Sequence, residues 1–272
     1  MTLRSLAVAA AVAVAAGIAA RDLANAQSSR ALSTIQVRLR QSSLTVHLAS
    51  PAASGARPLI VYATGDRGWP GDERLFDRMR PWGLPMAGFN SVDYIDSIDA
   101  PSRMIEPSGV SKDLGSIIDR AIEALRLPKD QPVVLVGFSR GAGLAVAAAT
   151  VPEFRSRVRG VVAVALAADE TYVADPATAG SDAKPLRTYE ALRDLGLLKV
   201  AIIQSTRDDI LPAAEARRRF GPDTSTRRLR PIDARDHSFG GKLDELVAEL
   251  KVSLDWVMAI LPGTRLSDFP TF

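Results

Sequence analysis

Three residues of this chain have the types and the order that nucleophilic catalysis requires: Ser139, Asp208 and His237. A serine hydroxyl attacks a carbonyl only when a base removes its proton, and a carboxylate must orient that base and stabilise its cation. Each of the three lies just beyond a predicted strand, and the order serine, acid, histidine is that of the α/β-hydrolase fold. The sequence therefore predicts a serine hydrolase of esters that forms an acyl-enzyme.

The stretch around Ser139 has the pattern of a nucleophile elbow, a tight strand-to-helix turn that exposes a serine. Residues 133–136 form a β-branched apolar run, typical of a strand buried on both faces of a parallel sheet. The pattern G-x-S-x-G follows, and then a helix rich in Ala and Gly. Side chains at Gly137 and Gly141 would collide with the strand or the helix, which favours an active nucleophile. An ordinary strand-to-helix turn is the alternative.

The carboxylate expected to orient His237 is Asp208, which follows a strand predicted at residues 199–204. Its neighbour Asp209 is the alternative. Asp208 is preferred because it lies nearer the end of the strand. If neither residue serves the histidine, Asp208 is a turn former and His237 a loop residue.

The loop at residues 64–69 is expected to complete the site, because it follows a buried strand predicted at residues 58–63. In a hydrolase of this kind, one oxyanion-hole amide follows the nucleophile and the other comes from such a loop. We therefore expect the amides of Asp66 and Arg140 to form the oxyanion hole, with Gly65 bordering the substrate. A plain loop between strand and helix is the alternative.

Strand and helix patterns alternate along the rest of the chain, without a visible repeat or second domain. They predict the α/β-hydrolase fold: a mostly parallel central sheet with helices on both faces and an N-terminal antiparallel hairpin. One domain is expected over residues 27–272, with a lid or insertion at 167–194. The other expected strands are 35–40, 44–48, 86–91, 158–166 and 226–232, and the expected helices include 72–82, 110–125 and 242–261.

The composition excludes several other classes of function. The 34 basic and 31 acidic residues nearly balance, and no Lys/Arg block has the length typical of nucleic-acid binding. Without cysteine, the chain has no disulfide, thiol catalysis or cysteine zinc site. Of its 2 histidines, His47 alternates with apolar strand residues and is expected to be exposed. We expect no metal, no organic cofactor and no nucleic-acid partner.

The N-terminal residues have the pattern of a cleavable export signal. Arg4 precedes an uncharged stretch at residues 6–20, and Ala24-Asn25-Ala26 predicts cleavage after Ala26. The alternative is a membrane anchor, but the stretch is shorter than the roughly 20 residues that a span requires. The mature protein is therefore expected in the periplasm or outside the cell, without a membrane span.

Further motifs accompany the triad along the chain. They are Thr64-Gly65-Asp66-Arg67-Gly68-Trp69, Ser91 with Tyr94, Pro107 with Gly109-Val110 and Asp113-Leu114, Gly137-Phe138-Ser139, and His237-Ser238-Phe239-Gly240-Gly241. Together they resemble the VirJ/AcvB family of exported bacterial virulence proteins over residues 59–261. The chain departs from the family pattern at Arg67, Arg140 and Gly143, where the family usually has Gly, Phe and Asp.

The resemblance implies the α/β-hydrolase fold, a periplasmic location and a link to virulence and type IV secretion, with secretion-system proteins as partners. The family includes hydrolases of lysyl-phosphatidylglycerol, which points to an ester on a phospholipid head group as the substrate. The alternative from another class is a non-catalytic periplasmic accessory or binding protein of a secretion system, built on the same scaffold.

Charged residues near the predicted nucleophile suit such a substrate. Arg67 and Arg140 are expected to face a phosphate, because a guanidinium pairs with phosphate bidentately. Asp66 and the lid acids Asp169 and Glu170 are expected to receive a cationic aminoacyl group. The alternative is that these side chains point to solvent, as most charged loop residues do.

Overall fold

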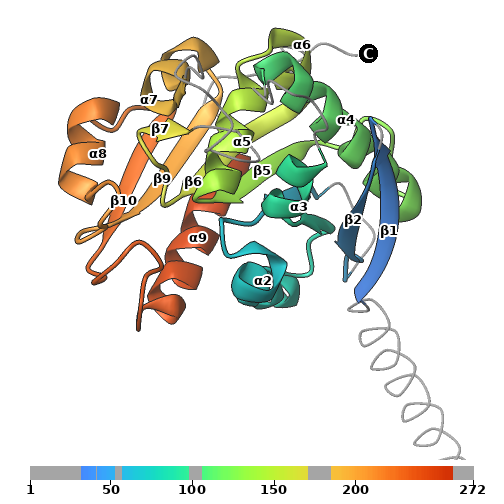
Figure 1. Cartoon of the computed structure of the whole chain (residues 1–272), viewed down its shortest axis with the longest axis horizontal. Coiled ribbons are helices and arrows are strands. Elements are labelled where there is room, and N and C mark those ends of the chain that lie inside the picture. The colour runs from blue at the N-terminus through green and yellow to red at the C-terminus, as the bar shows by residue number, and fades with distance from the viewer. Residues whose placement is uncertain (1–31, 41, 53–56, 98–105, 171–184, 260–272) are drawn as a thin grey trace, which may run out of the picture.

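The structure is a computed structural model that describes residues 32–40, 42–52, 57–97, 106–170 and 185–259 (Figure 1). The export signal predicted for residues 1–26 lies outside these residues, as does the middle of the predicted lid. Both therefore stay predictions. Within the described residues, no helix combines the length and the apolar character that crossing a bilayer requires.

The centre of the described part of the chain is one sheet of eight strands (Figure 1). They are β1 (Leu32–Leu39), β2 (Ser42–Ala49), β3 (Leu59–Ala63), β4 (Met86–Phe89), β5 (Val133–Phe138), β6 (Val158–Val164), β9 (Lys199–Ser205) and β10 (Arg227–Ile232). Their order across the sheet is β1-β2-β4-β3-β5-β6-β9-β10. β2 pairs antiparallel with β1 and β4, and all other neighbours are parallel. The predicted fold class is confirmed.

Helices cover both faces of this sheet (Figure 1). They are α2 (Gly68–Met79), α3 (Ser91–Asp96), α4 (Pro107–Ala124), α5 (Arg140–Ala149), α6 (Pro152–Arg155), α7 (Thr188–Ala191), α8 (Ala213–Phe220), α9 (Leu243–Met258) and the short 3₁₀-helices η1 (Arg80–Trp82) and η2 (Leu192–Leu195). α2 and α9 pack on one face, and α4, α5 and α8 on the other. In β5, Val133 and Leu135 face the core under α5, whereas Val134 and Val136 face the core under α9. This alternation explains why a strand buried on both sides is apolar at every position.

The helices α2 and α3 differ from what the sequence patterns predicted. α2 begins at Gly68, whose φ of 65° lets the chain turn from the loop directly into the helix. α3 lies where a loop was expected after β4. It begins there because the side chain of Asn90 accepts the N–H of Val92 at 3.1 Å and so caps the helix.

The prediction that His47 is exposed was wrong. Its ring stacks on Trp69, with ring centres 3.8 Å apart and planes 5° apart. The reason lies across the sheet, where His47 pairs with Gly88. A Cβ at Gly88 would lie 2.8 Å from Trp69, so only glycine leaves room for the indole. Burial lowers the pKa of His47, which favours the neutral ring.

The segment predicted as a lid, residues 167–194, is described at both of its ends. β7 (Asp169–Glu170) pairs antiparallel with β8 (Leu186–Arg187), and α7 and η2 follow. The backbone N–H of Thr188 donates to the carbonyl of Ala168 at 3.0 Å, which ties the end of the segment to its start. A lid function for this segment stays a prediction.

Candidate active site

Ser139 lies between β5 and α5 in a strained backbone conformation, with φ 50° and ψ −117°. Non-glycine residues adopt such dihedral angles only where the surroundings enforce them. A Cβ at Gly137 would lie 2.2 Å from the carbonyl oxygen of Gly141, and a Cβ at Gly141 would lie 2.3 Å from that of Ala63. The turn can therefore close only with glycine at both positions, as the sequence pattern predicts.

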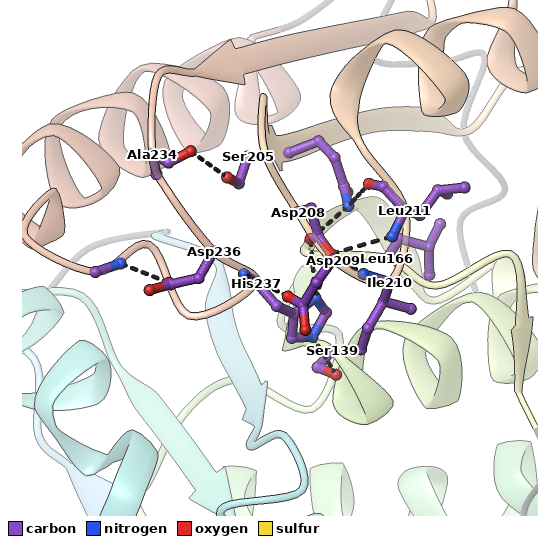
Figure 2. Close-up of polar contacts among 12 residues, drawn as sticks. Ser139, Leu166, Ser205, Asp208, Asp209, Ile210, Leu211, Ala234, Asp236 and His237 are labelled. Atoms are coloured by element: carbon purple, nitrogen blue, oxygen red, sulfur yellow. Dashed lines mark hydrogen bonds and ion pairs between the residues drawn. The ribbon is translucent and has the colours of Figure 1, made fainter.

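The structure brings Ser139, His237 and Asp208 into one chain of hydrogen bonds (Figure 2). The Oγ of Ser139 lies 2.8 Å from Nε2 of His237, and Nδ1 of the same ring lies 2.8 Å from Oδ2 of Asp208. The three residues come from the loops after β5, β10 and β9. Because these strands are parallel, their carboxyl ends meet at one edge of the sheet, where α/β proteins place their ligands.

Nearby acidic groups stabilise the protonated form of the His237 ring. Burial by itself would lower the pKa of this ring. The hydrogen bond to Asp208 and the nearby charges of Asp208, Asp209 and Glu170 outweigh burial and raise the pKa above its usual value. A histidine in this setting is a stronger base than a free imidazole, which suits removal of a proton from a hydroxyl.

The side chain of Asp208 is fully buried, and its carboxylate accepts several hydrogen bonds (Figure 2). Its Oδ1 accepts hydrogen bonds from the N–H groups of Ile210 at 2.8 Å and Leu211 at 3.0 Å. Its Oδ2 accepts a hydrogen bond from Nε2 of Gln204 at 2.9 Å. These bonds fix the orientation of the carboxylate toward the histidine ring. Sequence reasoning missed Gln204, although a glutamine at the end of an otherwise apolar strand was a visible signal.

Asp209, the alternative acid, contacts a different part of the histidine. Its Oδ1 accepts the backbone N–H of His237 at 3.2 Å, whereas no hydrogen bond between its carboxylate and the ring is present. Of the two neighbouring acids, Asp208 therefore has the geometry of the ring's partner. Asp209 instead helps to hold the loop that carries the histidine.

The loop after β3 lies against the nucleophile. A Cβ at Gly65 would lie 3.2 Å from the Cβ of Ser139. The side chain of Arg140 forms an ion pair with Asp66, so the two residues predicted to supply the oxyanion-hole amides lie together. The N–H of Asp66 makes no hydrogen bond with any residue that the structure describes. This amide is therefore available to a developing oxyanion.

The structure separates the two predicted lid acids. Glu170 is 8% exposed and interacts electrostatically with Arg140, Asp66 and His237. Its carboxyl group forms no hydrogen bond or ion pair with the described residues, and burial raises its pKa to about 7. Asp169 is exposed, because successive side chains of a strand point to opposite faces and that of Glu170 points inward. Asp169 lines a pocket of about 300 Å³, together with Arg187, Tyr189 and Arg219.

The predicted pairing of Arg67 and Arg140 toward one phosphate is not seen. The side chain of Arg67 lies over the first turn of α2, since a Cβ at Gly71 would be 3.1 Å from Nε of Arg67. The charge of Arg67 acts to lower the pKa of Asp72. Arg140 instead pairs with Asp66. Among the described residues, no group of three histidine, aspartate or glutamate side chains is arranged to hold a metal ion.

Comparison with solved structures relates the chain to α/β hydrolases. An α/β serine hydrolase homologue from Coxiella burnetii aligns with a TM-score of 0.58 at 17% identity, over 82% of this chain and 97% of that one. Est1E from Butyrivibrio proteoclasticus aligns with a TM-score of 0.58 at 12% identity, over 83% and 99% of the two chains. The esterase domain of a Rhodothermus marinus protein aligns with a TM-score of 0.57 at 16% identity, over 83% of this chain and 97% of that one. At these identities the likeness establishes the fold.

Sequence comparison adds a family. Residues 58–218 match the sequence model of a family described as bacterial virulence protein, VirJ. No curated protein shows significant sequence similarity to the chain. The matched residues include the loop after β3, the elbow and Asp208, but end before His237.

Proposed function

The chain belongs to the VirJ family of bacterial virulence proteins, and we propose that it is a serine hydrolase that cleaves esters through an acyl-enzyme. The observation that carries this proposal is the hydrogen-bond chain from Ser139 through His237 to Asp208. A binding scaffold has no need to hold a serine in a strained turn at 2.8 Å from a histidine. The likeness to esterases and serine hydrolases supports the same conclusion.

In the proposed reaction each group has a defined part. Nε2 of His237 takes the proton of Ser139 as Oγ attacks the ester carbonyl, and Asp208 holds the ring and stabilises its cation. The amides of Asp66 and Arg140 bind the oxyanion of the tetrahedral intermediate. The histidine then gives its proton to the leaving alcohol. Water, activated by the same histidine, releases the acyl group from Ser139.

A fluorophosphonate probe tests this proposal directly, because it reacts with an activated serine and forms a stable phosphonyl ester. We expect the folded protein to be labelled at Ser139, with labelling abolished by heat denaturation and in Ser139→Ala. Mass spectrometry of the labelled peptide identifies the residue. A folded protein that takes up no label would favour the non-catalytic accessory of a secretion system.

We further propose export to the periplasm and, as the substrate, an aminoacyl ester on an anionic phospholipid head group such as lysyl-phosphatidylglycerol. The predicted signal at residues 1–26 and the family membership support the location. Glu170 supports the substrate, because a buried carboxyl that forms no hydrogen bond or ion pair with the described residues suits an ammonium group. Arg140 could pair with a phosphate only by exchanging or sharing its contact with Asp66.

Separate measurement of lysine and fatty acid released from lysyl-phosphatidylglycerol tests the substrate. We expect lysine release by the wild type. In Glu170→Gln, which keeps the shape and removes the charge, the ratio of lysyl-ester to neutral-ester turnover should fall by about 10-fold, the effect of roughly 1.4 kcal/mol. Arg140→Ala should lower the same ratio, with phosphatidylglycerol as the control for fatty-acid release. An enzyme that turns over the neutral ester but releases no lysine would contradict the substrate.

A further inference from the structure

We propose that Asp72 is a positioning residue that fixes the loop after β3 so that the amide of Asp66 points at the reacting carbonyl. The proposal rests on the hydrolase function above, since it concerns the same site. Asp72 lies one turn inside α2 and is 8% exposed. Its Oδ2 accepts the backbone N–H of Gly65 at 2.7 Å. The carboxylate thus holds a residue of the loop that precedes its own helix.

Gly65 needs such a restraint because of its residue type. Glycine has the widest choice of backbone conformation, so its neighbours must determine the direction of the flanking peptides. A larger residue cannot take its place, because a Cβ would lie 2.9 Å from the ring of Phe138 and 3.2 Å from the Cβ of Ser139. The loop therefore combines close contact with the nucleophile and a flexible backbone.

Hydrogen bonds fix both peptide groups that flank Gly65. Asp72 binds the N–H on one side. On the other side, the carbonyl of Gly65 accepts hydrogen bonds from the hydroxyl of Ser91 at 3.2 Å and from the N–H of Gly68 at 3.1 Å. This carbonyl shares a planar trans peptide with the N–H of Asp66, so the two groups point in opposite directions. Holding the carbonyl toward Ser91 therefore turns the amide of Asp66 away from the protein interior.

Contacts around Asp72 offset part of the cost of burying its carboxylate. Burial raises the pKa of Asp72, whereas the N–H of Gly65 and the charges of Arg67 and Arg74 act in the opposite direction. The hydroxyl of Tyr62 donates to the backbone carbonyl of Asp72 at 3.2 Å and fixes the first turns of α2 against the sheet. A buried carboxylate that accepts a loop amide, rather than an amide of its own helix, is not a helix cap.

Two variants of Asp72 separate the positioning role from a structural one. Asp72→Asn keeps an oxygen that can accept the N–H of Gly65, whereas Asp72→Leu has similar size and no acceptor. For hydrolysis of p-nitrophenyl acetate we expect Asp72→Leu to lower kcat by about 10- to 100-fold, below the roughly 10²- to 10³-fold cost of removing an oxyanion donor outright. The KM should change by less than about 3-fold, since ground-state binding is untouched. Asp72→Asn should restore most of kcat.

The matched control is Asp77→Leu in the same helix, whose carboxylate forms an exposed ion pair with Arg80 at 3.0 Å. It should leave kcat within about 2-fold, the behaviour of a surface change. A boronate inhibitor that mimics the tetrahedral intermediate adds a second readout, because its affinity should fall with kcat in Asp72→Leu. If Asp72→Leu does not fold, Ser91→Ala, which removes one of the two hydrogen bonds to the carbonyl of Gly65, should also lower kcat and boronate affinity.

The results for the wild type and for the variants distinguish the two proposals. A wild-type protein without esterase activity or phosphonate labelling would contradict the proposed function. An active wild type whose Asp72→Leu variant folds and keeps kcat and boronate affinity would overturn the positioning role alone. Equal losses in Asp72→Asn and Asp72→Leu would also overturn it, because the charge and not the acceptor would then be the requirement.

Discussion

Ser139→Ala is expected to lower kcat for a short activated ester by about 10³-fold or more, the cost of removing a nucleophile from a triad. The attacking Oγ, 2.8 Å from Nε2 of His237, is lost, and with it the acyl-enzyme. The melting temperature should change little, because alanine keeps the Cβ and leaves Gly137 and Gly141 as they are. Initial rates and thermal unfolding of both purified proteins provide the measurement.

A matched control for this variant is Ser111→Ala. Ser111 is also a buried serine, and its Oγ donates to the carbonyl of Ser108 at 2.9 Å in the first turn of α4, far along the chain from the elbow. Its turnover should equal that of the wild type. Unchanged turnover in Ser139→Ala would remove Ser139 from the mechanism.

Asp208→Asn should cost about 10³- to 10⁴-fold in kcat, the range seen when the acid of a serine triad becomes an amide. Its side-chain oxygen would remain with the N–H groups of Ile210 and Leu211, which places the NH₂ group toward Nδ1 of His237. Nδ1 must then accept a hydrogen bond, and the ring proton moves to Nε2. A histidine with its proton on Nε2 cannot take the proton of Ser139.

Asp209→Asn is the matched control, because it makes the same chemical change one residue away. Its side-chain oxygen can still accept the backbone N–H of His237, so kcat should fall by less than about 10-fold, within the range of a lost charge near the site. Turnover of the two variants at several pH values provides the comparison. The reverse ranking would transfer the acid role to Asp209, and small losses in both would favour a binding protein.

Much of the fold and the site follows from short-range patterns. Residues 133–141 determine a buried strand and an elbow because the contacts that require Gly137 and Gly141 arise within a few residues and with the adjacent strand. The parallel sheet follows from apolar runs that alternate with amphipathic helices. The order of serine, acid and histidine then places the triad at the strand ends, where the structure brings them together.

Other features depend on segments that meet only in the folded chain. The neighbours Asp169 and Glu170 have the same charge, but the pairing of β7 with β8 buries only Glu170 near the triad. His47 lost its expected exposure because Trp69, from the next helix, covers it above Gly88. No local pattern marks such contacts, since each depends on the direction in which a distant side chain approaches.

The sequence by itself determined the family resemblance, the fold class and the residue proposed as the nucleophile, because these depend on residue order and on spacing along the chain. Only the tertiary structure decided between Asp208 and Asp209, and only it revealed Gln204 and Asp72 as partners of the site. Both acids follow the same strand and differ by one position. Which carboxylate meets the ring depends on how the loop after β9 turns against the loop after β10, and the hydrogen bonds within the fold fix that turn.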